Sequence, residues 1–384
     1  MKYKEILGYN STLPKPKKSY YYEHKINGEL MHKNTIVAKI VEDELQVINE
    51  KMLPSYFKLG GDLRHWLENR CIDMHRRNSR LLRKMLSIKT TNEIEVVLSV
   101  NAHTLTDNYW IRLNNNLKYE DISYSKDLLF DTSLTGDTSL IDSAELQNYN
   151  SPDLTLGGSF EKGWKLKDGK WYLVKAGNII NNSVELIASY LCEYFGFNHV
   201  KYYKFNEVCV FCENFTDNLK FDFEPMFDFL NDEEGFDISI DYISKINKSF
   251  VKDFLNMLFL DSILLNPDRH TNNYGLLRDS LTGEFIGLAP IFDNNLALFA
   301  TKQNISNLDV GNKGQLEMFY MPILDEYNYK VPELNYDDLY KMVDKAYSDF
   351  KPVNYTVEFT TDFIWNKYNY IKDRLKHILD NLNL

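Results

Sequence analysis

Residues 266–275 read Asn-Pro-Asp-Arg-His-Thr-Asn-Asn-Tyr-Gly, and Phe292-Asp293-Asn294 follows after a hairpin-length gap. These two segments supply Asp268, an Asn five positions later (Asn273) and a second carboxylate, Asp293. Residues 276–278 and 285–288 have the composition of two strands around a Gly-containing turn. Because an antiparallel hairpin returns the chain to its starting edge, we expect Asn273 and Asp293 to be neighbours.

This set of side chains has the composition that phosphoryl transfer from ATP requires. One carboxylate orients the acceptor hydroxyl, and an Asn with an Asp holds magnesium. Mg²⁺ prefers oxygen ligands, and a site with only a few protein oxygens leaves coordination positions for the phosphates of a nucleotide. The sequence therefore predicts ATP and Mg²⁺ as cofactors, with Asp268 as the catalytic carboxylate and Asn273 and Asp293 at the metal. His270 in the same turn is a candidate catalytic residue, although it can also fix the loop by packing and hydrogen bonding.

The segment upstream supplies candidates for holding the nucleotide. A glycine turn between two strands lets backbone N–H groups approach phosphates, and here residues 155–162 form such a turn. A lysine within a strand is costly to bury without an anion, and Lys175 ends a strand-like run. Glu185, ten residues on, is a candidate ion-pair partner, although a capping-box role after Asn182 is equally open. The predicted nucleotide-binding residues are Thr155, Gly157, Gly158, Ser159, Lys162, Lys175 and Glu185.

The pattern along the chain favours an α+β fold, and the resemblance to protein kinases described below implies that it has two lobes. We expect an N-terminal accessory region (1–145), a small lobe with an antiparallel sheet and one helix (146–225), and a mostly helical large lobe (226–384). Asp168-Gly169 predicts a hairpin in the small lobe. The apolar spacing from residue 184 predicts a helix, capped by Asn182 or Ser183 at its start and Gly196 at its end.

Composition excludes some classes of protein. No apolar run is long enough to span a membrane, no signal-peptide stretch opens the chain, and four cysteines form no disulfide framework, so we expect a cytoplasmic protein. The net charge of −11 argues against direct nucleic-acid binding. Residues 1–90 are nevertheless basic, and residues 61–87 read as a helix with a solvated face that carries Arg76, Arg77, Arg80, Arg83 and Lys84. Cys209 and Cys212 lie three apart on a predicted strand and are interpreted as structural.

Residues 266–275 and 289–295 (Ala-Pro-Ile-Phe-Asp-Asn-Asn) resemble the HipA-like Ser/Thr protein kinases of bacterial toxin–antitoxin systems, which are distantly related to the phosphatidylinositol 3/4-kinases. The resemblance covers residues 150–300. It implies Asp268 as the base, Asn273 and Asp293 as Mg²⁺ ligands and Lys175 as an ATP contact. Residues 155–162 resemble the family's phosphate loop, with Thr155 in place of its leading Ser and Phe160 in place of a Gln.

The resemblance also implies a protein substrate, a cognate antitoxin and self-inhibition by autophosphorylation of the phosphate loop, on Thr155, Ser159 or Ser151. Two alternatives stay open. One is a kinase of phosphoinositides or other small molecules, which share the Asp-Arg-His turn, although no basic amphipathic helix indicates a membrane. The other is a non-catalytic nucleotide-binding or interaction module.

Overall fold

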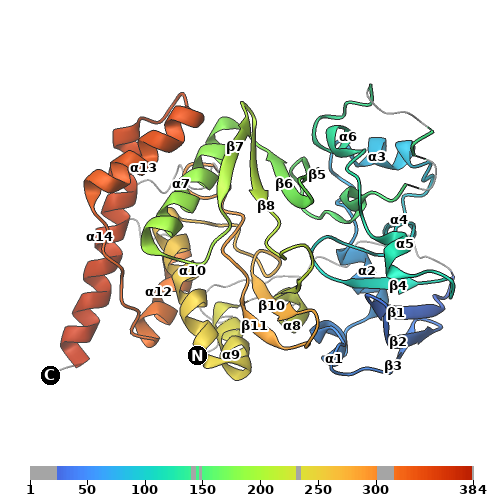
Figure 1. Ribbon diagram of the computed structural model, residues 1–384. Helices are drawn as coiled ribbons and strands as arrows, with labels where there is room; N and C mark the ends of the chain where they lie inside the picture. The colour runs from blue at the N-terminus through green and yellow to red at the C-terminus, as the bar shows by residue number, and fades with distance from the viewer. Residues whose placement is uncertain (1–23, 140–143, 147–148, 231–234, 301–314, 383–384) are drawn as a thin grey trace.

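The computed structural model describes residues 24–139, 144–146, 149–230, 235–300 and 315–382 (Figure 1). The expected two-lobed α+β architecture with an N-terminal region is confirmed. A four-stranded antiparallel sheet with one long helix forms the small lobe, and helices with a three-stranded sheet form the large lobe. No helix among the described residues is both long and apolar enough to cross a bilayer.

The N-terminal region has its own sheet and its own hydrophobic core, which includes Leu30, Trp66 and Ile111. Its sheet has the order β3-β2-β1-β4 and is antiparallel throughout. The strands are β1 (Gly28–His32), β2 (Thr35–Val41), β3 (Glu44–Val47) and β4 (Tyr109–Arg112). The helices are α1 (Ser55–Lys58), α2 (Leu63–Asn69), α3 (Ser79–Met85), α4 (Glu93–Leu98), α5 (Tyr119–Ile122) and α6 (Phe130–Thr135).

The single helix expected over residues 61–87 is wrong in its middle part. The chain leaves α2 at Asn69 and re-enters a helix only at Ser79. Arg76 lies in the intervening turns and is 2% exposed, so it does not belong to a solvated basic face. Arg77 and Arg80 are exposed, as predicted. In these turns the Arg76 guanidinium donates to backbone carbonyls of residues 156 and 162, described below.

The small lobe is the sheet β5-β6-β8-β7 with helix α7 (Ile179–Phe195) against it. Its strands are β5 (Lys162–Lys167), β6 (Lys170–Ala176), β7 (Tyr202–Asn206) and β8 (Cys209–Glu213). Asp168 and Gly169 form the predicted two-residue hairpin, with φ of 51° and 75°. The predicted N-cap of α7 is wrong. Asn178 caps the helix through Asn181 N, one turn before the expected residues, while Gly196 ends it with φ 70° as predicted.

The large lobe is built on α10 (Val251–Leu264), which is buried along nearly its whole length. Asn266-Pro267 stops this helix, as expected from the restriction that proline imposes on the residue before it. The other elements are β9 (Phe221–Pro225), α8 (Phe227–Leu230), α9 (Phe236–Ile246), β10 (Gly275–Asp279), β11 (Phe285–Leu288), α12 (Gln315–Glu326), α13 (Tyr336–Asp349) and α14 (Val357–Leu382). Strand β9 pairs with β10, where only glycine fits at position 275 because a Cβ would lie 2.2 Å from Glu224 O.

Buried polar contacts join the N-terminal region to β9 and β10. His32 Nε2 lies 2.8 Å from Asp222 Oδ2, and both side chains are almost fully buried. Arg278 forms an ion pair with Glu224 (Nη2–Oε1, 2.7 Å) and donates to Leu53 O at 3.1 Å. These contacts fix the N-terminal region on the sheet whose central strand, β10, follows directly after the 266–275 turn.

Candidate active site

The turn that follows α10 holds its own residues in place through local hydrogen bonds. Asp268 O accepts from His270 N (2.9 Å) and from Asn273 Nδ2 (2.9 Å). The second bond leaves Oδ1 of the Asn273 amide as the atom that can accept from, or coordinate, a ligand. His270 is exposed, and its Nδ1 accepts from Asn272 N at 3.3 Å, so it stabilises the turn.

Asp268 is half-buried beside other charged groups. Burial raises the pKa of the Asp268 carboxyl, His270 opposes that shift, and the Asp293 carboxylate adds to it. A carboxyl with a raised pKa is a better proton acceptor in its ionised form, which is what a general base needs.

Lys175, Glu185 and Asp293 form a charged cluster in which the first two are buried and Asp293 is half-buried. Lys175 Nζ lies 3.4 Å from Glu185 Oε1 and donates to Asp293 Oδ1. Burial alone would lower the pKa of Lys175, but Asp293 and Glu185 outweigh it and hold the pKa above its usual value. Burial would likewise raise the pKa of Asp293, but Lys175 and Lys162 hold it well below its usual range. The opposing charges favour the charged form of Lys175 and the ionised form of Asp293.

Glu185 is in the second turn of α7 and does not take part in a capping box. Its Oε2 accepts from Asn294 N at 2.7 Å, next to Asp293. The Glu185 side chain is fully buried. Through its two oxygens it connects α7 to Lys175 of β6 and to Asn294. The predicted partnership with Lys175 is present in the structure.

Lys162 was predicted from the glycine-containing loop, and the structure places it beside Lys175. The two residues are direct partners across β5 and β6, and both are buried. Burial lowers the pKa of Lys162 to about 8, with Lys175 and Arg76 acting in the same direction and Asp293 opposing them. Lys175 has two carboxylate partners, Glu185 and Asp293, whereas Lys162 has no ion pair of its own among the described residues.

The loop that precedes β5 carries the remaining predicted residues. Gly157, Gly158 and Ser159 are exposed at its tip, and Gly158 has φ +86°. Thr155 is half-buried, and its hydroxyl lies 3.0 Å from His103 O and 3.1 Å from Pro152 O. Ser151 is fully buried and donates to Asp153 Oδ2 at 3.0 Å. The three candidate phosphate acceptors therefore differ strongly in accessibility.

Arg76 is a site residue that sequence reasoning missed. Its Nη1 donates to Leu156 O (3.0 Å) and its Nη2 to Lys162 O (2.6 Å), which are the two ends of the glycine loop. The sequence signal was a cluster of arginines, and nothing local distinguished the buried member from its exposed neighbours. Arg76 fixes the spacing of the loop ends from within the N-terminal region.

One cavity of about 820 Å³ collects these groups. It is lined by every predicted site residue except the fully buried Glu185, namely Thr155, Gly157, Gly158, Ser159, Lys162, Lys175, Asp268, His270, Asn273 and Asp293. Residues 213–215, which leave β8, also line it together with Leu173 and Phe292. Phe292 stacks on Phe215 with ring centroids 5.4 Å apart, which gives this end of the cavity an apolar wall suited to a flat base.

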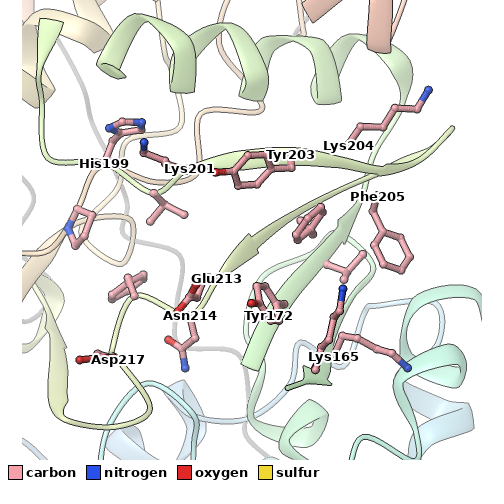
Figure 2. Close-up of a pocket in the computed structure, with 16 residues that line it drawn as sticks. Lys165, Tyr172, His199, Lys201, Tyr203, Lys204, Phe205, Glu213, Asn214 and Asp217 are labelled. Atoms are coloured by element: carbon pink, nitrogen blue, oxygen red, sulfur yellow. The ribbon is translucent and has the colours of Figure 1, made fainter. Parts of the chain in front are cut away.

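A second cavity of about 870 Å³ lies on the other face of the small-lobe sheet (Figure 2). Tyr172 and Val174 of β6 line it, whereas Leu173 and Lys175 line the first cavity, as strand alternation requires. It contains none of the predicted site residues. Apart from Glu185, which lines neither cavity, the carboxylates, amide and lysines of the predicted site line the first cavity.

Comparison with known proteins gives structural matches only. No protein-family model matches the chain, and no curated protein does. The structure is similar to HipA of Shewanella oneidensis MR-1, solved as a toxin–antitoxin complex with HipB and operator DNA, with a TM-score of 0.49 and 11% identity over 92% of this chain and 97% of that chain. It is also similar to the proinflammatory kinase CtkA of Helicobacter pylori, with a TM-score of 0.42 and 18% identity over 60% of this chain and 94% of that chain.

Proposed function

We propose that the protein is an ATP-dependent kinase that phosphorylates Ser or Thr hydroxyls of a protein substrate. The observation that carries the proposal is the convergence of Lys175, Asp293 and the turn that holds both Asp268 and Asn273 on one cavity, from three separate parts of the sequence. Catalysis of phosphoryl transfer is mainly positioning and electrostatic stabilisation, and this cavity supplies groups for both.

Each part of the cavity fits one part of the nucleotide. Residues 213–215, Leu173 and Phe292 provide the surface for the adenine. Lys162, Lys175 and the glycine loop face the phosphates. Asn273 Oδ1 and the ionised Asp293 would hold Mg²⁺, which neutralises phosphate charge when bound. The described residues contain no cluster of three or more His, Cys, Asp or Glu side chains that could hold a metal ion.

Asp268 is the group proposed to accept the proton of the attacking hydroxyl. It lies on the same turn as Asn273 and within the electrostatic influence of Asp293, so the acceptor and the metal–phosphate group would meet at this turn. In keeping with the HipA-like resemblance, we also propose autophosphorylation of the glycine loop, a cognate antitoxin as partner, and a cytoplasmic location. The Shewanella HipA was solved with HipB and operator DNA, and the absence of nucleic-acid binding expected from the net charge is not part of this proposal.

Incubation with radiolabelled ATP and Mg²⁺ tests the proposal. We expect transfer to protein in a cell lysate, or to the protein itself, and none to phosphoinositide vesicles. Transfer should disappear in the Asp293→Ala variant and with EDTA. Labelling of vesicle lipids instead of protein would support the small-molecule alternative, and ATP binding without any transfer would support a non-catalytic nucleotide-binding module.

A further inference from the structure

The guanidinium of Arg269, between the proposed base and the proposed metal ligands, uses all of its hydrogen-bonding capacity. An arginine side chain has five N–H donors, and each of the five has an acceptor here. The acceptors are Asp261 Oδ2 (from Nε, 2.8 Å), Asp261 Oδ1 (from Nη2, 3.0 Å), Asn294 Oδ1 (from Nη2, 2.7 Å), Asn273 O (from Nη1, 2.9 Å) and Phe292 O (from Nη1, 2.6 Å). The side chain is 0% exposed, so none of these bonds is shared with bulk water.

Three of the five acceptors belong to the segments that carry the proposed metal ligands. One is the backbone carbonyl of Asn273 itself. The other two, Phe292 O and Asn294 Oδ1, lie on the residues immediately before and after Asp293. A single planar group therefore sets the distance between the two segments, which are twenty positions apart in the sequence.

Asp293 also requires such restraint because of its backbone. Its φ is 60°, in the left-handed region that costs a non-glycine residue about 1–2 kcal/mol. Arg269 binds on both sides of this residue, and Glu185 accepts from Asn294 N. These contacts hold Asp293 in a conformation that the chain does not favour by itself.

Asp261 anchors the arginine to the core of the large lobe. It lies in the last turn of α10, is fully buried, and also accepts from Asn266 Nδ2 at 3.0 Å. A buried carboxylate needs a paired cation. The pair with Asp261 therefore fixes the orientation of the Arg269 guanidinium, the planar fork of N–H donors, relative to α10.

We propose that Arg269, oriented by Asp261, is a positioning residue that sets the separation and orientation of the Asn273–Asp293 metal-binding pair. This inference rests on the proposed kinase function. Arg269 touches neither nucleotide nor metal. It acts through the backbone of the residues that do, as partners of ligating side chains do in metal sites, where their loss weakens metal affinity by about 10–100-fold.

The test uses the full chain and the variant Arg269→Lys, which keeps the charge but removes the fork. Arg278→Lys is the matched control, because Arg278 is also a fully buried arginine in an ion pair (Glu224, 2.7 Å) but lies outside the proposed site. Three quantities are measured for each protein: the affinity for Mn²⁺ by electron paramagnetic resonance with a non-hydrolysable ATP analogue present, the affinity for that analogue in EDTA, and the melting temperature.

We expect Arg269→Lys to weaken Mn²⁺ binding by about 10–100-fold while analogue affinity in EDTA stays near that of wild type. Arg278→Lys should lower the melting temperature comparably and leave Mn²⁺ affinity unchanged. Equal loss of Mn²⁺ affinity in both variants would show that Arg269 is only structural and would overturn the inference.

Two further variants keep the test decisive. If Arg269→Lys does not fold, Asn294→Ala removes one of the three positioning contacts and leaves the Asp261 pair intact, and unchanged Mn²⁺ affinity there would overturn the inference. Asp293→Ala separates the two proposals. If wild type binds Mn²⁺ no better than Asp293→Ala, the proposed metal site itself fails. If Asp293→Ala loses binding and Arg269→Lys does not, only the positioning role fails.

Discussion

Lys162 and Lys175 lie directly opposite each other on β5 and β6, and both are buried. Like charges at opposed positions of a sheet repel, so this arrangement is unfavourable unless an anion lies between or beside them. Asp293 and Glu185 compensate Lys175, and Lys162 is left with a lowered pKa. We expect this lysine pair to contact the phosphates of the proposed nucleotide, and the first prediction depends on it.

The first prediction concerns pH. The pKa of Lys162 is lowered to about 8, so the side chain carries its charge below that pH and loses it above. Triphosphate binding favours the charged form. Affinity for ATP in EDTA should therefore be full near pH 7 and fall as pH rises from 7 to 9. Calorimetric titration across this range checks it, with Lys162→Met as the control in which the dependence should be much reduced.

The second prediction concerns the glycine loop. A Cβ at Gly158 would lie 2.6 Å from Lys162 Nζ on a backbone with φ +86°, whereas nothing lies within 4 Å of a Cβ at Gly157. The conformational cost of alanine at position 158 is about 1–2 kcal/mol. We expect Gly158→Ala to weaken ATP binding about tenfold, since 1.4 kcal/mol corresponds to tenfold. Gly157→Ala should bind like wild type, and equal losses in both would contradict this reading of the loop.

The third prediction concerns the catalytic carboxylate. Asp268→Asn keeps the shape of the side chain but cannot accept a proton from a hydroxyl. We expect the transfer rate to fall by about 10²–10⁴-fold, the range for loss of a general base. The affinity for ATP with Mg²⁺ should change little, because Asn273 and Asp293 are intact. An Asp268→Asn variant with wild-type transfer would remove Asp268 from the mechanism.

The fourth prediction concerns the site of autophosphorylation. Ser159 is exposed at the loop tip, Thr155 is half-buried with its hydroxyl near two carbonyls, and Ser151 is fully buried. Mass spectrometry after incubation with ATP should find phosphate on Ser159 before Thr155, and none on Ser151. Phosphate on Thr155 alone would show that the loop leaves the conformation described here during the reaction.

Local sequence patterns were sufficient for the central part of the site. The hairpin between Asn273 and Asp293 is a short-range feature, and its geometry follows from turn residues and alternation. The same is true of the β5–β6 hairpin, which places the loop before Lys162 at the edge that Lys175 reaches. In these cases, the interactions that determine the structure lie within about twenty residues.

The features that sequence reasoning missed depend on contacts between distant segments. Arg76 appeared to be one of five basic residues on a helix face, and only the carbonyls of residues 156 and 162 distinguish it. The start of α7 was placed one turn late, because Asn178, Asn182 and Ser183 are all good N-cap residues and the spacing of apolar residues does not choose among them. The pairing of His32 with Asp222 spans 190 positions and has no local signature.

The N-terminal region holds parts of both lobes in place. Arg76 donates hydrogen bonds to both ends of the glycine loop, and His32 pairs with the buried Asp222 at the interface with β9. Cutting the chain near residue 145 and removing the N-terminal part would leave the buried Asp222 carboxylate without His32 and the glycine loop without the Arg76 hydrogen bonds. We therefore expect a fragment that contains only the two lobes to be recovered aggregated unless residues 24–139 are supplied beside it.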